Sequence, residues 1–570
     1  ALTIVINISS PSINRRFKAL LKMNKQKRPF VTTFPWQRWE GLSGWNYYFL
    51  LKFGLLWSGY LNFHALANLV FACVLIYPIT LPKLRKFRSL LMFPIGIGLF
   101  YHDTWLPGIE SVRAQGSEVV GFSWDYMIEL TQRFTNWNMI AGAFVLLVLF
   151  KFLKEWIRIT PFSMTGLLLL TLQPYLNIQL SVAAPTTSTS MNSKTKISGT
   201  TNSTVASIQN NATVDNQTLN TYITDFYNKE KSRQVSFPQS LPANSEPFDV
   251  LLINICSLAW DDIDMIHLMD HPLWKHFDIL FKNFNSVTGY SGPASIRLLR
   301  ASCGQPSNAD LFKPADPHCY LFENLKALGF NQEVALDHTG VYGNYLQELR
   351  DGAALKQPLM SQQGLTVTYN GFDGSPIYDD GELFKRWLRN RTVSDAEKSV
   401  TFFNLITLHD GNHLLGKTES APYGDRAKKL FDQLDEFLSN LEKSGKRYMV
   451  VVVPEHGAAL RGDKLQMSGL RDIPMPYITH VPVGIQFINM KATTTHQTNE
   501  IDQPSSFLAL SELISRSLKN NIFGTDTVDW TALTNQLPET ASVSENEGSR
   551  VVQYQGKTYI QLNEGDWIPE

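Results

Sequence analysis

The sequence predicts an N-terminal helical transmembrane bundle followed by an α/β domain outside the membrane. Long apolar stretches crowd into the first 180 residues, and short apolar runs alternate with amphipathic segments after residue 246. Short continuous runs rich in Val and Ile are typical of strands buried on both faces of a parallel sheet. Their alternation with helical segments predicts an α/β fold with helices on both faces of that sheet.

About five apolar stretches in the first part of the chain come close to the roughly 20 residues that a membrane-spanning helix needs. They cover residues 45–61, 62–82, 89–106, 137–154 and 163–182, the last of which contains Pro174. Buried core helices of a soluble domain are the alternative. The crowding of so many stretches into so few residues favours a transmembrane bundle over residues 41–183.

The basic residues predict how this bundle is oriented. Lys and Arg cluster before the first stretch, between the second and third, and between the fourth and fifth, so all three clusters fall on one side of a membrane crossed five times. The positive-inside rule then places residues 1–40 in the cytoplasm and everything after residue 183 outside. Met23 is a plausible translation start, and residues 1–22 are assigned no function.

The chain contains four cysteines, two of which are expected to form a disulfide. Cys303 and Cys319 are close in sequence and lie outside the membrane on this topology, where thiols are oxidised, so we expect them to pair. Cys256 is then unpaired, and binding to a metal would protect its thiol; a buried, unreactive thiol is the alternative. Cys73 falls within a predicted span and is expected to be an apolar filler.

Beyond the bundle, composition divides the chain into three segments. Residues 184–245 are rich in Thr, Ser, Asn and Gln and predict a polar linker. Residues 246–530 form the predicted catalytic α/β domain, with strands expected at 249–255, 401–408 and 448–453 and a helix at 424–443. Residues 531–570 are a polar C-terminal extension with a hairpin expected over 550–562. Basic and acidic residues number 51 each, so no basic excess indicates nucleic acid as a partner.

Residues that can bind a metal or a phosphate follow the apolar runs of the α/β domain. Run 250–255 ends on Cys256, run 287–290 leads to Ser291, run 402–408 ends on His409, and run 449–453 leads to Glu455 and His456. Ligand sites of parallel sheets lie beyond the carboxyl ends of the strands, so these residues are expected to converge. A thiolate, a carboxylate and an imidazole, with an open position for a hydroxyl, indicate a tetrahedral catalytic zinc site.

Ser291 is the candidate nucleophile. It stands in Tyr290-Ser291-Gly292-Pro293 at the expected start of a helix, where a capping role is the alternative. Free backbone N–H groups at a helix start suit a phosphate, and a metal there would lower the pKa of the hydroxyl. His409, or His413 four residues later, could transfer the proton, with a loop-capping role as the alternative for one of them.

Other charged residues have less specific patterns. Arg471 and His480 are candidates for contact with a substrate phosphate, as are Arg297 and Arg461, although nothing in the sequence separates these four from ordinary surface residues. Asp261 and Asp262 are expected to begin a helix, because acidic side chains favour the first turn.

Four motifs give the chain a resemblance to a known family. They are Gly41–Asn46, Asn254–Asp262, Tyr290–Pro293 and Pro454–Gly457. With five N-terminal spans, a polar tether and an external α/β domain, the chain resembles the phosphoethanolamine transferases of the alkaline phosphatase superfamily, and most closely their cellulose-modifying branch. The resemblance implies an alkaline-phosphatase-like α/β/α domain in the periplasm, attached to the bacterial inner membrane by a multi-pass bundle.

The resemblance also implies a mechanism. Cys256, Ser291, Glu455 and His456 would surround one zinc ion, with Ser291 as the nucleophile and Tyr290 beside it as a further catalytic candidate. Phosphoethanolamine would pass from phosphatidylethanolamine to the C6 hydroxyl of glucose in cellulose. Membrane lipids and subunits of the cellulose synthase complex would be the partners.

The chain departs from the lipid A-modifying relatives at three positions. It has Cys256 in place of an acid, Ser291 in place of threonine and Glu455 in place of aspartate, which favours cellulose over lipid A as acceptor. A transferase acting on lipid A or glycerol phosphate is an alternative, and so is a non-catalytic membrane scaffold of the synthase complex. A sulfatase is not favoured, since its modification signature needs an Arg where the chain has Ser295.

Overall fold

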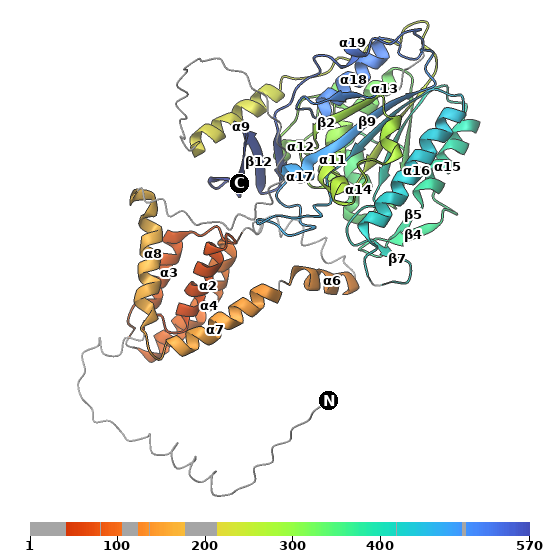
Figure 1. Ribbon diagram of the computed structural model, residues 1–570. Helices are drawn as coiled ribbons and strands as arrows, with labels where there is room; N and C mark the ends of the chain where they lie inside the picture. Colours follow the sequence, from red (N-terminus) through yellow and green to blue (C-terminus); the bar gives the residue numbers. More distant parts are fainter. Residues whose placement is uncertain are drawn as a thin grey trace, which may run out of the picture. The chain divides into compact units, whose positions relative to one another are not determined.

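The computed structural model describes residues 41–79, 81–104, 124–135, 137–176, 214–417, 419–492 and 497–570. They belong to two compact units (Figure 1). The smaller unit covers 1–54, 64–100 and 145–181, and the larger covers 55–63, 101–144 and 182–570. The expected cytoplasmic segment 1–40, which includes Met23, lies outside the described residues, as do residues 184–213 of the expected linker.

The five apolar stretches of the N-terminal region all contain helices. These are α2 (Trp45–Trp57), α3 (Ala65–Ile76), α4 (Pro82–His102), α7 (Trp137–Leu153) and α8 (Ile159–Leu176). Within the smaller unit, α3 packs against α8, and buried polar side chains pair with one another. Lys52 donates a hydrogen bond of 2.7 Å to Oδ1 of Asn68, and Ser163 donates one of 3.0 Å to Oδ1 of Asn46.

Among the described helices, none is by itself both long and apolar enough to cross a membrane. One pair of helical segments meets that test when taken together: Tyr126–Gln132 and Trp137–Leu153, which meet at a bend of 53°. The first of these segments lies in α6 (Trp124–Phe134). The transmembrane bundle therefore stays a prediction.

The larger unit is built on a seven-stranded sheet with the strand order β10-β2-β9-β8-β1-β6-β3. The strands are β1 (Asp249–Ile255), β2 (Ile279–Asn285), β3 (Asn331–Leu336), β6 (Ser399–Leu405), β8 (Tyr448–Pro454), β9 (His480–Ile488) and β10 (Asn499–Ile501). Only β9 runs against its neighbours, β8 and β2. The sheet is thus parallel through β8, β1, β6 and β3, where the site residues were expected.

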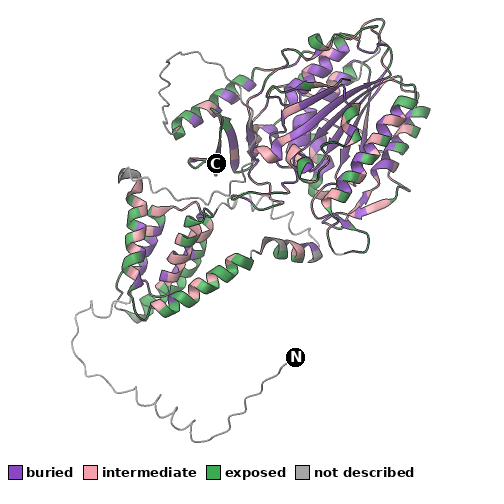
Figure 2. Cartoon of the chain, in the orientation of Figure 1, coloured by how far each residue is buried: buried purple, intermediate pink, exposed green. Residues whose placement is uncertain are grey.

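Both faces of this sheet are buried, which explains why its strands are apolar throughout (Figure 2). Val250 and Leu252 of β1 face one hydrophobic cluster, and Leu251 and Ile253 face the other. The first cluster includes residues of α11 (Ser291–Leu299), α13 (Leu321–Ala327), α14 (Tyr345–Ala353) and α18 (Phe507–Lys519). The second includes residues of α10 (Trp260–Met265), α15 (Asp380–Val393) and α16 (Tyr423–Lys443). The predicted α/β fold and the helix expected at 424–443 are confirmed.

The central strands end at the same level. Ile255 lies opposite Pro454 of β8 and Leu405 of β6, so the chain leaves all three strands at one edge of the sheet.

Two predicted strand bounds differ from the structure. Strand β6 ends at Leu405, three residues earlier than the predicted 401–408. The run 287–290 was wrongly grouped with the strands: β2 ends at Asn285, and Val287 has a φ of 75°, outside the extended range.

The predicted linker is too long, because its second half contains a folded helix. Residues 216–230 form α9 (Asn216–Glu230), whose Leu219, Ile223 and Phe226 are buried against a small antiparallel sheet. That sheet consists of β11 (Val543–Asn546), β12 (Ser549–Tyr554), β13 (Lys557–Leu562) and β14 (Trp567–Pro569). The hairpin expected over 550–562 is therefore confirmed, but residues 531–570 are more than a polar extension.

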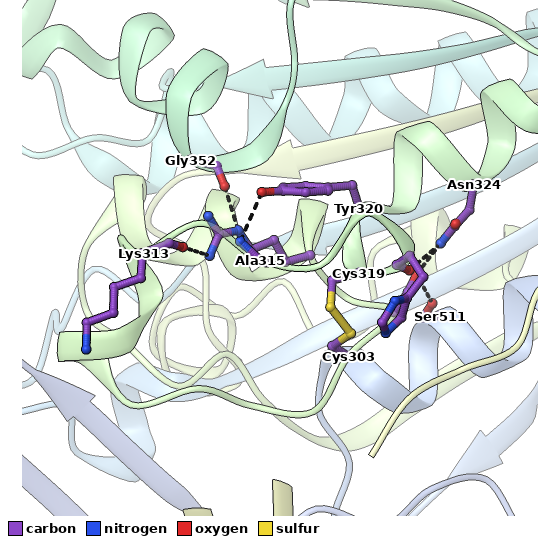
Figure 3. Close-up of a disulfide and its surroundings, with 11 residues drawn as sticks. Cys303, Lys313, Ala315, Cys319, Tyr320, Asn324, Gly352 and Ser511 are labelled. Atoms are coloured by element: carbon purple, nitrogen blue, oxygen red, sulfur yellow. Dashed lines mark hydrogen bonds between the residues drawn. A yellow bond between two sulfur atoms is a disulfide. The ribbon is translucent and has the colours of Figure 1, made fainter. Parts of the chain in front are cut away.

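The expected disulfide between Cys303 and Cys319 is present (Figure 3). It fixes the loop that follows α11 to the start of α13, with the two Cα atoms 4.9 Å apart. Asn324 supports the same loop by donating hydrogen bonds to the carbonyl of His318 and the hydroxyl of Ser302. Of the other two cysteines, Cys73 is exposed on α3 and Cys256 is buried.

Candidate metal centre

Cys256, Ser291, Glu455 and His456 converge beyond the carboxyl ends of β1 and β8, as predicted. Oγ of Ser291 lies 3.4 Å from Sγ of Cys256 and 3.4 Å from Nε2 of His456. Sγ of Cys256 is 3.9 Å from Nε2 of His456, which in turn is 3.9 Å from Oε2 of Glu455. Cys256, Glu455 and His456 are fully buried, and one possible ligand atom of each lies within 4.8 Å of those of the other two.

Ser291 is the first residue of α11, and its hydroxyl does not cap the helix as the alternative interpretation held. The N-cap residue is Tyr290, whose side chain makes no capping hydrogen bond and instead donates from its hydroxyl to Asp472. The Ser291 hydroxyl is thus directed to Cys256 and His456. Its place at a helix start still leaves free backbone N–H groups next to it, which suits a phosphate.

The imidazole of His456 is prepared to bind a cation through Nε2. Its Nδ1 is 2.9 Å from the carbonyl of Gly457, a contact in which Nδ1 carries the proton and donates. Burial and the charge of Arg471 lower the pKa of His456 well below its usual range, so the ring stays neutral. A neutral ring with Nδ1 protonated presents an unprotonated Nε2 toward Cys256 and Ser291.

Glu455 is held in place through one of its two oxygens. Oε1 accepts hydrogen bonds from Ser295, at 3.0 Å, and from Asn404, at 2.6 Å. Oε2 is buried and receives no hydrogen bond from any described residue. A buried carboxylate oxygen without a donor costs free energy unless a cation or proton is present, so Oε2 fits a metal ligand.

The donor set fits zinc. Burial, with a further contribution from the charge of Glu455, raises the pKa of the Cys256 thiol to about 12 when no cation is present. A buried thiol of this kind becomes a thiolate only when a positive charge is close. Sulfur, imidazole nitrogen and carboxylate oxygen, with the Ser291 hydroxyl in a fourth position, match the ligands and open position of a catalytic zinc site.

A cavity of about 580 Å³ opens next to this cluster. Ser291, Tyr290, His409 and Arg471 line it, as expected for a nucleophile, its neighbour, a proton carrier and a phosphate contact. Arg471 donates a hydrogen bond of 2.9 Å to the hydroxyl of Ser257, which follows Cys256 in the chain. A guanidinium therefore lies beside the candidate metal ligands and can donate to phosphoryl oxygens.

The two candidate histidines occupy different environments. Nδ1 of His409 is 2.8 Å from the carbonyl of Asp410, and the ring stacks on Phe372 at 4.7 Å. Burial and the charge of Arg471 lower the pKa of His409 to about 4, so the ring is neutral and can accept a proton. His413 is not among the residues lining the cavity; it is buried in β7 (His413–Leu414), with Nε2 3.5 Å from Oε2 of Glu129. The structure therefore favours His409 over His413 as the proton carrier.

Several charged candidates lie outside the centre. His480 begins β9 opposite Asn285, in the sheet and not in the cavity. Arg297 is buried and donates to the carbonyl of Pro306, whereas Arg461 pairs with Asp261 and Asp264 at the surface. Asp261 and Asp262 lie in the first turn of α10, as predicted. Asp262 also accepts backbone hydrogen bonds from Ala259, Ala458 and Leu460, which join the loops after β1 and β8.

Sequence reasoning missed the polar residues that support the centre. Asn254 and Asn404 lie at equivalent positions of β1 and β6, where Nδ2 of Asn404 is 3.2 Å from Oδ1 of Asn254. A polar amide near the end of an apolar strand must find a buried partner, and this was the available signal. Asn546 of β11 could not be identified in this way, because it does not follow an apolar run. It joins the Ser291 loop to the Arg471 loop, because it accepts from Thr288 and Gly289 and donates to the carbonyls of Arg471 and Asp472.

The chain matches known proteins over most of its length. Residues 203–567 match the family described as the cellulose biosynthesis protein BcsG C-terminal domain, and residues 45–172 match the BcsG N-terminal domain. The chain is 52% identical over 542 residues to Cellulose biosynthesis protein BcsG of Escherichia coli (strain K12), covering 94% of this chain and 97% of that protein. It is 51% identical over 547 residues to the protein of the same name from Salmonella typhimurium (strain LT2), with the same two coverages.

Solved structures match the chain at low sequence identity. The C-terminal periplasmic domain of EcEptC from Escherichia coli, in complex with Zn, superposes with a TM-score of 0.38 at 14% identity, covering 55% of this chain and 93% of that domain.

Proposed function

The chain belongs to the BcsG family of cellulose biosynthesis proteins, and on this premise we propose that it transfers phosphoethanolamine from phosphatidylethanolamine to the C6 hydroxyls of glucose in cellulose. Ser291 is the nucleophile of this proposal and becomes esterified with phosphoethanolamine during the reaction. Zinc is the proposed cofactor, with Cys256, Glu455, His456 and the hydroxyl of Ser291 as its ligands.

One observation carries the proposal: the Ser291 hydroxyl lies 3.4 Å from both the thiol of Cys256 and Nε2 of His456. A serine at the start of a helix, between two metal donors, has the surroundings of an activated nucleophile. When bound, zinc would lower the pKa of the Ser291 hydroxyl and stabilise the negative charge that develops on the phosphoryl group.

The residues around the nucleophile can supply the remaining chemistry. In the first half-reaction, Oγ of Ser291 bonds to phosphorus while the bond from phosphorus to the diacylglycerol oxygen breaks. His409 takes the proton from Ser291 and gives it to the departing diacylglycerol. In the second, a glucose C6 hydroxyl bonds to phosphorus and gives its proton to His409, which returns it to Ser291 as the serine ester breaks. The lowered pKa of His409 keeps the ring neutral, which is the form that can accept a proton.

Arg471 and Tyr290 complete the proposed active site. Arg471 donates to non-bridging phosphoryl oxygens, which do not change partners between the two half-reactions. Tyr290 is linked through its hydroxyl to Asp472, directly after Arg471, and so fixes the loop that carries the guanidinium next to the start of α11.

The proposed substrates imply a location. We assign the α/β domain of the larger unit to the periplasm and helices α2, α3, α4, α7 and α8 to the inner membrane, where a multi-pass anchor would keep the enzyme next to its lipid donor and to cellulose leaving the synthase. The distribution of Lys and Arg and the disulfide between Cys303 and Cys319 support this assignment. Subunits of the cellulose synthase complex are the proposed protein partners.

Mass spectrometry of the full-length protein mixed with phosphatidylethanolamine vesicles tests the proposal. We expect a phosphoethanolamine group on the peptide that contains Ser291, and its transfer to cello-oligosaccharides when these are added. Lipid A offered as acceptor should leave the adduct in place. Polymer modification that persists in Ser291→Ala would show that the mechanism is wrong.

A further inference from the structure

We propose that helix α6 rests on the periplasmic surface of the inner membrane and forms the wall of the cavity along which the lipid donor enters. This inference rests on the proposed function, because it concerns the route by which phosphatidylethanolamine would reach Ser291. The partner of α6 is the phospholipid bilayer, which the exposed side chains of Trp124 and Ile128 contact. Neither residue belongs to a motif or an apolar stretch on which the sequence analysis depended.

Helix α6 is fixed to the α/β domain by one face. The ring of Tyr126 lies 5.9 Å from that of Phe372 and 6.2 Å from that of His413. Three residues further on, Oε2 of Glu129 accepts a hydrogen bond of 2.8 Å from the hydroxyl of Ser420 and lies 3.5 Å from Nε2 of His413, so α6 is beside β7 (Figure 1). Side chains three positions apart share one side of a helix, and α6 therefore turns the side with Tyr126 and Glu129 towards the α/β domain.

The same side of α6 forms part of the wall of the cavity of about 580 Å³. Tyr126 and Leu130 line this cavity together with Ser291 and His409. A Cβ atom added to Gly411 would lie 2.5 Å from the ring of Tyr126, so α6 is in close contact with the turn that follows His409. A lipid donor held at Ser291 would thus have α6 as one wall of its binding site.

The opposite side of α6 exposes apolar side chains. Trp124 is 84% exposed, and Ile128, one turn further along, is 55% exposed. Two residues along an α-helix change the direction of a side chain by about 200°, so Trp124 and Ile128 point away from the side that carries Tyr126. Trp side chains are enriched at membrane–water interfaces, and apolar side chains gain free energy by leaving water. This division of α6 suits a helix that lies on a bilayer surface.

The continuity of the chain identifies the bilayer as the partner of this exposed side. Helix α7 begins at Trp137, three residues after α6 ends. Tyr126–Gln132 and Trp137–Leu153 are the one pair of segments among the described helices that together are long and apolar enough to cross a membrane, and they meet at a bend of 53°. With α7 assigned to the inner membrane, α6 is the point at which the chain reaches the membrane surface. The bend allows α6 to depart from the direction of α7 and to follow that surface.

Fluorescence quenching by lipids tests the proposal with the full-length protein in phospholipid nanodiscs. Ile128→Cys, in a Cys73→Ser background, would carry an environment-sensitive fluorophore on the exposed side of α6. Cys256 is buried and Cys303 and Cys319 are paired, so the label has one target. We expect phospholipids with a nitroxide near the headgroup to remove most of the fluorescence of this label.

Val393→Cys in the same background is the matched control. Val393 is 82% exposed and ends α15, two residues after Arg391. Arg391 pairs with Asp249 at the first residue of β1, which is the opposite edge of the sheet from Ser291. The label at position 393 should keep its fluorescence. A label at position 128 that is quenched no more than the one at 393 would overturn the inference and leave the proposed function intact, because quenching measures no chemistry.

Two forms of the donor give a second readout. Ile128→Glu should lower kcat/KM for phosphatidylethanolamine in vesicles about 10-fold, because it removes one apolar contact with the bilayer. The variant should release para-nitrophenol from the soluble donor para-nitrophenyl phosphorylethanolamine at the wild-type rate, and Val393→Glu should act on both donors like wild type. Equal losses on the two donors in Ile128→Glu would contradict a role for α6 in lipid entry. Release by wild type that does not depend on Ser291 would instead overturn the proposed function.

Discussion

The side chain of Asn404, on β6, donates a hydrogen bond of 2.6 Å to Oε1 of Glu455, at the end of β8, across the intervening strand β1. The amide of Asn404 is itself oriented by His338, whose Nε2 lies 2.9 Å from its Oδ1 and whose Nδ1 accepts from the backbone of Gly340. Burial lowers the pKa of His338 to about 4, so this histidine is a neutral donor. Because His338 and Asn404 together hold Oε1 of Glu455, Oε2 is the oxygen that remains for a metal.

Asn404→Ala should therefore weaken zinc binding about 10- to 100-fold, because losing a hydrogen bond to a ligating carboxylate leaves that ligand poorly oriented. Competition with a chromogenic chelator measures the affinity without relying on activity. Asn331→Ala is the control, since Asn331 is exposed at the start of β3. Equal zinc affinities in Asn404→Ala and wild type would contradict the assigned role of the hydrogen bond.

Replacing the two histidines one at a time should separate chemistry from structure. His409→Ala should slow both half-reactions about 100- to 10,000-fold, the usual contribution of a proton carrier, with zinc content unchanged. His413→Ala should keep most of its turnover and lose thermal stability, because His413 is buried in a small sheet away from the cavity. Single-turnover rates and zinc analysis distinguish the two variants, and a larger loss of turnover in His413→Ala would reverse the assignment.

The free energy of unfolding should fall as the pH rises, because Asp337 and Asp380 form a buried pair of acids next to the loop that leads to His409. Asp337 accepts backbone hydrogen bonds from Ile406 and Thr407, and Asp380 accepts one from the hydroxyl of Thr407. Burial raises the pKa of Asp337 well above its ordinary value and that of Asp380 from 3.8 to about 7. A folded-state pKa above the unfolded value means that the fold binds the proton more tightly, so this stabilisation is complete below 3.8 and is lost as the pH rises through about 7.

Asp380→Asn imitates the protonated acid and should remove this pH dependence. We expect similar melting temperatures for wild type and variant at about pH 5, and a variant that melts several degrees higher at about pH 8. Differential scanning calorimetry of both proteins at each pH makes the comparison. A difference in melting temperature that stays constant with pH would show that the pair does not share a proton in the fold.

Removing the disulfide should destabilise the larger unit without abolishing zinc binding. Cys303 and Cys319 are separated by 16 residues, and a cross-link over a loop of that length contributes about 3 kcal/mol. Urea unfolding of the double variant Cys303→Ser/Cys319→Ser measures the loss, with Cys73→Ser as the control for removing a cysteine outside the disulfide. An unchanged unfolding midpoint in the double variant would exclude a stabilising role for the cross-link.

The candidate metal ligands could be predicted because each follows a strand that is evident from its apolar sequence. Cys256 follows the apolar run of β1, and Glu455 and His456 follow that of β8. Parallel strands that end at one edge bring such residues together whatever their separation in the chain. The pattern of apolar residues could not predict the direction of β9. A strand buried on both faces has the same apolar sequence whether it runs parallel or antiparallel to its neighbours.

Two features depended on contacts between residues distant in the sequence. Helix α9 lies in a polar tract, and only the spacing of Leu219, Ile223 and Phe226 indicated it; these residues pack on strands more than 300 positions later.

The roles of His409 and His413 could not be separated either. The chain reverses between them at Gly411, whose φ of 76° is accessible mainly to glycine, and so only one of the two histidines reaches the cavity.

X-ray absorption at the zinc edge of the purified full-length protein tests the central claim most directly. The account predicts one zinc with a single sulfur ligand at about 2.3 Å and its other ligands, nitrogen and oxygen, at about 2.0–2.2 Å. The sulfur contribution should disappear in Cys256→Ser and persist in Cys73→Ser. A protein that binds no zinc, or binds it without sulfur, would contradict the assignment of Cys256, Ser291, Glu455 and His456 to one metal centre.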